Sequence, residues 1–204
     1  MGLYREYVLP VLVDATCGSA ALRSFRERAV EGLRGEVLEI GFGSGLNVPH
    51  YPPEVRVVYA VEPAHRARRM AEERVLASHA QVHHVGLDGA RIPLPDASCD
   101  SALSTFTLCT IPDVEGALAE VHRVLRPGGT FHFLEHGLSP DAGVARAQRW
   151  LEPVQRRVAD GCHLTRDAAG LVRDAGFAIR SVDSRYGLGP SPWSWLTLGV
   201  AEVV

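Results

Sequence analysis

A glycine-rich turn between two glutamates is the part of this sequence whose spacing most clearly indicates chemistry. The stretch 39–45 reads Glu-Ile-Gly-Phe-Gly-Ser-Gly directly after a short apolar run, and Glu62 closes the next apolar run. Glycines let a backbone turn tightly and approach a ligand closely. A carboxylate at a strand end can hydrogen-bond a ribose diol. The pattern predicts a nucleotide-type cofactor site; the simpler alternative is a tight turn with two ordinary carboxylates.

A second group of chemically capable side chains lies later in the chain. Glu135 ends the expected strand 130–135, His136 follows it, and His163 precedes an expected helix start. A carboxylate and an imidazole together can deprotonate or orient a nucleophile. We take Glu135, His136 and His163 as candidate catalytic residues. A structural role is the alternative for His136 and the favoured one for His163.

The four cysteines do not have the spacing of a metal site. They form no Cys-x-x-Cys pair, which predicts reduced thiols, and the favoured role for Cys109 and Cys162 is core packing. His83 and His84 are adjacent on an expected strand, so their side chains face opposite ways. No metal site is predicted.

Composition excludes several functions. The chain has 204 residues, and its 21 basic residues are all arginine. Without lysine there is no P-loop, no protein-kinase core and no pyridoxal Schiff base. A net charge of −3 without a basic stripe argues against nucleic acid as a partner. The apolar run Tyr7–Val13 is too short to cross a bilayer. We therefore expect a cytoplasmic protein without stable membrane insertion.

Short apolar runs alternate with amphipathic segments from residue 35 onward. Expected strands are 37–40, 55–61, 81–85, 101–105, 130–135, 179–183 and 195–203. This alternation predicts an α/β fold, a doubly wound, mostly parallel sheet with helices on both faces. We expect one domain over 35–204, preceded by an N-terminal helical cap or lid over 1–34. In such sheets, ligands bind beyond the carboxyl ends of the strands.

Three helix starts carry capping signals. Asp113 precedes an apolar stripe at helical spacing, Ser139-Pro140 combines an N-cap with a proline at the first helical position, and Thr165 precedes a shorter helix. The second of these predicts a helix of about twenty residues that ends near Gly161.

The ordered motifs resemble those of class I S-adenosylmethionine-dependent methyltransferases. Residues 39–45 resemble the family's first motif, Glu62 its ribose-binding acid, 85–96 its adenine-reading segment, and 125–129 the turn before strand five. The resemblance covers about residues 35–203. It implies a Rossmann-like, seven-stranded sheet with an antiparallel last strand. It also implies S-adenosylmethionine as cofactor and S-adenosylhomocysteine as product.

The resemblance assigns candidate cofactor roles to individual residues. Glu39 would orient the glycine loop or the methionine amine, the loop glycines would pass under the methionine and ribose, and Asp88 with Gly89 would contact the adenine. The implied cofactor-binding set is Glu39, Gly41, Gly43, Gly45, Asn47, Glu62, Pro63, Asp88, Gly89 and Thr105.

A narrower resemblance concerns the methyl acceptor. Residues 107–109, 133–136 and 160–166 are similar to segments of small thiol methyltransferase-like proteins. This implies a small-molecule acceptor, with a thiol as the sharpest hypothesis and a phenol, lipid or quinone as alternatives. A nicotinamide-dependent oxidoreductase also remains open, although Gly-x-Gly-x-Gly fits it poorly and a Tyr-x-x-x-Lys pair is impossible without lysine. The oligomeric state stays open.

Overall fold

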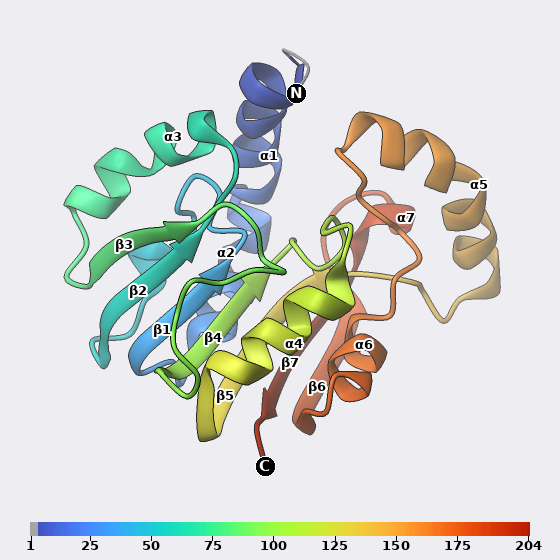
Figure 1. Cartoon of the computed structure of the whole chain (residues 1–204). Helices are drawn as coiled ribbons and strands as arrows, with labels where there is room; N and C mark the ends of the chain where they lie inside the picture. Colours follow the sequence, from blue (N-terminus) through green and yellow to red (C-terminus); the bar gives the residue numbers. More distant parts are fainter. Residues whose placement is uncertain (1–3) are drawn as a thin grey trace.

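A seven-stranded sheet forms the centre of the molecule (Figure 1). The computed structural model describes residues 4–204, so residues 1–3 of the expected N-terminal cap lie outside the described part. The strands follow the order β3-β2-β1-β4-β5-β7-β6. Their bounds are β1 Gly35–Ile40, β2 Val55–Val61, β3 Gln81–Gly86, β4 Cys99–Thr105, β5 Leu125–His136, β6 Ala178–Tyr186 and β7 Trp195–Glu202.

The strand directions confirm the predicted doubly wound sheet. Strands β3, β2, β1, β4 and β5 pair in parallel, whereas β7 is antiparallel to both of its neighbours, β5 and β6. The chain order reverses beside β1, next to β4. The carboxyl ends of β1 and β4 therefore meet at the switch point, where ligands bind in such sheets.

Helices cover both faces of the sheet, as expected (Figure 1). On one face, α2 (Ala20–Val30) and α3 (His65–Leu76) pack through Phe25, Val30 and Ala71 into a core cluster. On the other face, α4 (Val114–Val124) and α6 (Ala168–Asp174) bury Leu118, Val121 and other apolar side chains. Alternate strand residues supply the two clusters, because successive side chains of a strand point to opposite faces.

Aspartates cap the three helices for which capping was predicted. The Asp113 side chain accepts from the Gly116 N–H at the start of α4, which confirms the first prediction. The other two predicted caps, Ser139 and Thr165, were wrong. Asp141 caps α5 (Ala142–Val158) and Asp167 caps α6, in place of Ser139 and Thr165. The Ser139 hydroxyl instead contacts the Tyr186 hydroxyl and the Asp141 N–H, so it is not available to the helix.

The N-terminal segment contains two different kinds of helix. Among the described residues, α1 (Leu9–Cys17), which follows the short π-helix η1 (Tyr4–Val8), has no fully buried side chain, whereas α2 contributes to the core. The remaining short elements are η2 (Val48–His50) and α7 (Ser191–Ser194). No single described helix is long and apolar enough to cross a membrane. The stretches 6–17 and 20–30 meet that criterion only as a pair, bent by 83°.

Candidate active site

A cavity of about 960 Å³ opens at the carboxyl ends of the central strands. One end is lined by the loop after β1 and by Glu62 after β2. The other end is lined by Cys109, His136 and Cys162. Residues of α1 and of the segment 188–196 complete the wall. The topology thus brings together the carboxyl-terminal ends of the five parallel strands β1 to β5.

The loop after β1 requires glycine at Gly41. Its φ is +70°, a conformation that residues with a Cβ adopt rarely, and a Cβ there would lie 2.6 Å from the Cβ of Thr107. Gly43 also has a positive φ, +57°, but a Cβ there would meet nothing closer than 3.9 Å. Gly41 therefore allows close packing against the loop after β4, whereas Gly43 exposes backbone to the cavity.

The Glu62 carboxylate lies beneath this loop and lines the cavity. Its Oε2 accepts from the Gly43 N–H and its Oε1 from the Ala64 N–H, both at 2.8 Å. Burial raises the pKa of Glu62, and these two backbone donors partly offset that effect. Each oxygen has accepted one hydrogen bond, and a carboxylate offers about four acceptor sites. Capacity for a diol therefore remains.

Glu39 lies behind the glycine loop and outside the cavity lining. Its carboxyl accepts from Asn47 Nδ2 at 2.9 Å and from the Tyr51 hydroxyl, and it is 1% exposed. Burial raises the pKa of Glu39 to about 7, although the Tyr51 and Asn47 hydrogen bonds and the charge of Arg26 act in the opposite direction. This geometry matches the role of orienting the loop more closely than direct contact with a ligand.

A buried network connects Glu39 to the cavity wall. Arg26 Nη1 donates to Asn47 Oδ1 at 2.7 Å and to Thr105 Oγ1 at 3.1 Å, and Asn47 Nδ2 also reaches Thr105 Oγ1 at 3.0 Å. Asn47 and Thr105 line the cavity, as does Arg26. The sequence did not indicate Arg26, because it lies on a helix that precedes every recognised motif.

The remaining candidate cofactor residues divide into two groups. Pro63, Asp88 and Gly89 line the cavity near Glu62. Gly45 does not. A Cβ at Gly45 would lie 3.3 Å from Ala71 Cβ, so this glycine lets the loop pack closely on α3.

Glu135 holds the loop after β4 in place. Its Oε1 accepts from the N–H groups of Thr107 and Leu108, at 2.9 and 3.0 Å, and from the Ser104 hydroxyl at 2.9 Å. Burial is the main cause that raises the pKa of Glu135, which lies outside the cavity lining. Phe106 in this loop has φ +55°, so the carboxylate stabilises an uncommon backbone conformation. We infer that Glu135 positions the site without contacting substrate.

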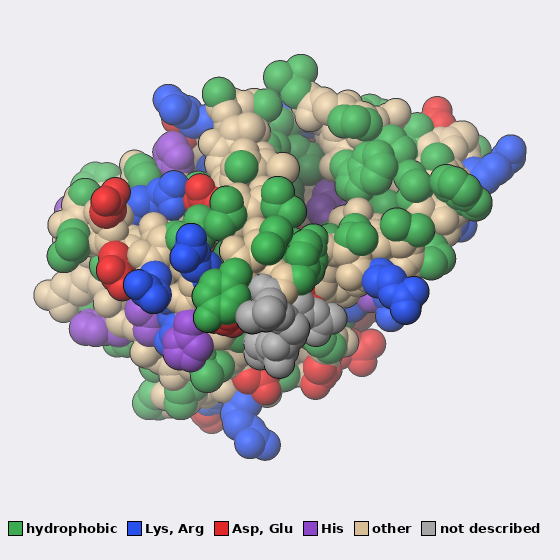
Figure 2. Space-filling view, turned by 90° about the horizontal axis from the view of Figure 1, so that it is seen from above, with side chains coloured by type: hydrophobic (Ala, Val, Ile, Leu, Met, Phe, Trp, Pro, Cys, Tyr) green, Lys and Arg blue, Asp and Glu red, His purple; other side chains and the backbone are tan. Residues whose placement is uncertain are grey.

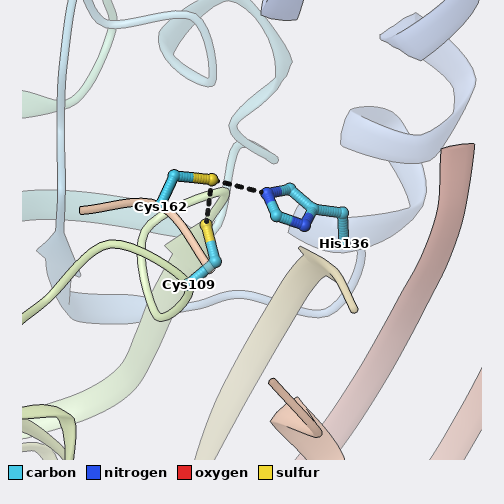
Figure 3. Close-up of side chains that lie close together, drawn as sticks. All are labelled: Cys109, His136 and Cys162. Carbon is cyan, nitrogen blue, oxygen red and sulfur yellow. Dashed lines mark hydrogen bonds between the residues drawn. The ribbon is translucent and has the colours of Figure 1, made fainter. Parts of the chain in front are cut away.

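His136 lines the cavity together with two cysteines (Figure 3). Its Nε2 lies 3.0 Å from Cys162 Sγ, which lies 3.8 Å from Cys109 Sγ. Burial lowers the pKa of His136, but the hydrogen bond to Cys162 and the electrostatic influence of Cys162 and Glu135 act in the opposite direction, and the pKa is raised. Sequence spacing gave no signal for this cluster, since the two cysteines are 53 positions apart.

His163 lies away from the cavity lining. Its Nδ1 is 2.7 Å from Glu152 Oε1 on α5, and the other oxygen of Glu152 accepts from the Leu164 N–H. The backbone N–H of His163 donates to the Cys109 carbonyl at 2.8 Å. The side chain thus contacts α5, while its backbone connects the two cysteine-bearing loops.

Comparisons with known proteins agree with this geometry. Residues 38–133 match the family model described as "Methyltransferase domain". The chain is 34% identical over 178 residues to a thiol S-methyltransferase of Rattus norvegicus, covering 83% of this chain and 70% of that protein. It is 29% identical over 137 residues to a phosphatidylethanolamine N-methyltransferase of Cereibacter sphaeroides, covering 65% of this chain and 66% of that protein.

Solved structures show the same fold. A methyltransferase of Haloferax volcanii, solved with the Trm112 activator, superposes with a TM-score of 0.73 at 16% identity and covers 98% of this chain and 96% of that one. The sequence relatives extend the likeness from the fold to the motifs, which favours methyl transfer over the oxidoreductase alternative. The chain belongs to the class I S-adenosylmethionine-dependent methyltransferases.

Proposed function

We propose that this protein transfers a methyl group from S-adenosylmethionine to the sulfur of a small, largely apolar thiol. One observation carries the proposal. The glycine loop and Glu62 occupy one end of the same cavity whose other end holds His136, Cys109 and Cys162. A donor site and an acceptor site therefore share a single enclosure.

The residues at the first end fit the cofactor. Glu62 has remaining acceptor capacity for the ribose hydroxyls, Asp88 lies exposed beside it for the adenine, and the backbone at Gly43 leaves space for a close approach. When bound, S-adenosylmethionine supplies a methyl group that its sulfonium already activates. The protein contributes positioning and the exclusion of water, which can supply much of a catalytic rate enhancement.

The second end fits an apolar acceptor. Leu188 and Trp193 of the segment after β6 line the cavity, and Leu9 and Val13 of α1 add apolar side chains to its wall. Figure 2, which looks down on this side of the molecule, shows hydrophobic side chains gathered over it. A thiol is a few per cent thiolate at neutral pH and is intrinsically nucleophilic, so it needs less activation than an alcohol or amine. The thiol S-methyltransferase named among the relatives supports this choice.

In this proposal, His136 is the catalytic residue that contacts the acceptor, and Glu135 is a positioning residue. Replacing His136 with alanine should lower kcat by roughly 100-fold, the lower end of the contribution of a positioned acid–base side chain. The affinity for S-adenosylhomocysteine should stay within about twofold. A fall in that affinity equal to the fall in kcat would contradict the separation of the two ends.

We further propose that α1 acts as a lid. None of its side chains is fully buried, and its hydrogen bonds with the site, among the described residues, involve only the Cys17 carbonyl, which accepts from Arg26, and the Asp14 carboxylate. The Ser44 hydroxyl donates to Asp14 Oδ1 at 2.5 Å, and Arg74 Nη1 donates to the same oxygen at 2.9 Å. These contacts join the lid to the glycine loop, so bound cofactor and lid position would be coupled.

The test of the proposed function is turnover. The protein is supplied with S-adenosylmethionine and a panel of alkyl thiols, phenols, amines and a phosphatidylethanolamine dispersion, and release of S-adenosylhomocysteine is measured. Turnover on alkyl thiols at least tenfold above the other acceptors is expected. Turnover confined to a phenol, amine or lipid would overturn the thiol assignment. Calorimetric binding of NADH without binding of S-adenosylhomocysteine would overturn the cofactor.

A further inference from the structure

We propose that Cys109, His136 and Cys162 form a binding site for a divalent zinc ion, with a fourth position open to the cavity. The ion would hold the acceptor as a metal-bound thiolate, so that His136 would act on the acceptor through the ion, and this last step rests on the proposed function. The sequence predicted no metal here. The fold brings the three ligands together from the loop after β4, the end of β5 and the loop after α5.

The donor atoms have the separations of a tetrahedral site. The two sulfurs and a ring nitrogen all lie within 4.8 Å of one another, and the sulfurs are 3.8 Å apart. Two sulfurs bound at the usual zinc–thiolate distance would be roughly 3.8 Å apart, and sulfur and nitrogen roughly 3.6 Å apart. The observed Nε2 to Cys162 Sγ distance is 3.0 Å, so the ring must withdraw by about half an ångström.

The ligands stand on a rigid frame of hydrogen bonds. Glu135 holds the N–H groups that lead to Cys109, and the His163 N–H donates to the Cys109 carbonyl at 2.8 Å. Arg166 Nη1 donates to the carbonyls of Leu108 and Ile111. This support holds Cys109 close to Cys162 before any ion binds, as a selective metal site requires.

The imidazole lacks good partners without an ion. His136 Nδ1 is buried and has no hydrogen-bond partner among the described residues, and Nε2 faces only a thiol sulfur. A sulfhydryl is a weak hydrogen-bond partner, and a buried polar group left unsatisfied is destabilising. A bond from Nε2 to a metal would replace its weak contact with the thiol, and Nδ1 would then carry the ring proton.

The donor set also indicates the ion and its chemistry. Two thiolates and one imidazole suit zinc, and three protein ligands with an open position are typical of catalytic rather than structural zinc. Binding would release the two cysteine protons to solvent. An acceptor thiol that takes the fourth position would release its own proton to solvent and remain bound as a thiolate, with no change in oxidation state.

The experiment measures metal binding directly. Reduced, metal-free full-length protein is titrated with Co²⁺ and, separately, with Zn²⁺. One equivalent of Co²⁺ should bind and give the intense visible bands of tetrahedral cobalt with thiolate-to-cobalt charge transfer, and Zn²⁺ should abolish them. Weak octahedral bands, or no saturable binding, would overturn the proposal. So would a persistent Cys109–Cys162 disulfide in protein purified without a chelator.

Variants localise the site. Cys109→Ala and Cys162→Ala should each weaken Co²⁺ binding by roughly 100-fold or more, since even outer-shell changes cost up to that factor. Cys99→Ala removes another buried cysteine, one on β4 outside the cluster, and should bind as wild type does. Equal binding by all three variants would contradict the assignment. The wild-type spectrum stays decisive even if one variant fails to fold.

Two further readouts separate this inference from the proposed function. Co²⁺ binding without turnover of any thiol would remove the proposed function and leave the metal site standing. Full thiol turnover by protein stripped to less than about a tenth of an equivalent of metal would leave the proposed function standing and would overturn the role of the ion in holding the acceptor. The affinity for S-adenosylhomocysteine should change by less than about twofold in Cys109→Ala, because that residue is at the other end of the cavity.

Discussion

The two ends of the cavity are built in different ways. At the donor end, the residues that line the cavity come mainly from one contiguous stretch, 41–47, and from Glu62 after the neighbouring strand. At the acceptor end, the three reactive side chains come from three segments, and Cys109 and Cys162 are 53 positions apart. A cofactor shared by a whole family can be bound by a local motif. An acceptor site is assembled by the topology of the sheet.

Gly41 packs the glycine loop against Thr107, in the loop after β4 that also carries Cys109. Its substitution is expected to have the largest effect. Gly41→Ala should lower the free energy of unfolding by about 2–5 kcal/mol, because it combines a positive φ with overpacking against Thr107. Both S-adenosylhomocysteine binding and turnover should fail together. Chemical denaturation measures the stability, calorimetry measures the binding, and release of S-adenosylhomocysteine measures the turnover.

Gly128→Ala is the matched control for that variant. Gly128 has φ +74°, close to the value at Gly41, but a Cβ there meets nothing within 4 Å. It should lower stability by only about 1–2 kcal/mol, the backbone contribution alone. Equal losses of stability in the two variants would mean that the contact between Gly41 and Thr107 contributes nothing. The two ends of the cavity would then be structurally independent.

The buried carboxyl of Glu39 gives the next largest effect. In the folded protein its pKa is about 7, above the ordinary 4.5, so the folded state holds a proton that the unfolded chain has lost. This stabilisation is complete below pH 4.5 and is lost as the pH rises through 7. The free energy of unfolding of the wild type should therefore fall by roughly 3 kcal/mol between about pH 4 and about pH 8, relative to that of Glu39→Gln. Denaturation curves at several pH values measure this difference, and parallel stability profiles would contradict it.

Glu62 tests the donor end alone. Glu62→Ala should weaken S-adenosylhomocysteine binding by about 1.5–3 kcal/mol, or roughly 10-fold to 150-fold, because a charged hydrogen-bond acceptor is lost. Calorimetry gives the dissociation constant. Glu72→Ala, at an exposed position on α3, is the control and should bind normally. Unchanged affinity in Glu62→Ala would place the ribose elsewhere.

The lid contact should give the smallest effect. Asp14→Asn weakens a partly exposed ion pair with Arg74, and such pairs contribute about 0–1 kcal/mol. Cleavage of α1 by a low concentration of protease should become about twofold to fivefold faster. Glu202→Gln weakens a pair with Arg180 at the far edge of the sheet and should leave this rate unchanged. Equal rates in all three proteins would rule out Asp14 as the residue that holds the lid.

Local patterns predicted most of the fold and the donor end. The glycine loop and Glu62 were visible because each stands directly after a buried apolar strand. The helix starts were less predictable. Ser139 and Asp141 are both good capping residues two positions apart, and only the contact between Ser139 and Tyr186 decides that Asp141 caps α5. Tertiary contacts thus override local preference.

The acceptor end could be predicted only in pieces. His136 was a candidate because it follows a strand, but nothing in the spacing of Cys109 and Cys162 linked either residue to it. Their proximity depends on the order of β4 and β5 and on the path of the loop after α5. The role of Glu135 was equally hidden, because backbone N–H groups, its main partners, leave no trace in the sequence.

A crystal structure of the protein with S-adenosylhomocysteine tests the central claim most directly. We expect the ribose hydroxyls to lie on the Glu62 carboxylate and the sulfur to face the part of the cavity lined by Cys109, His136 and Cys162. A ribose bound away from Glu62, or a sulfur that faces away from those three side chains, would contradict it.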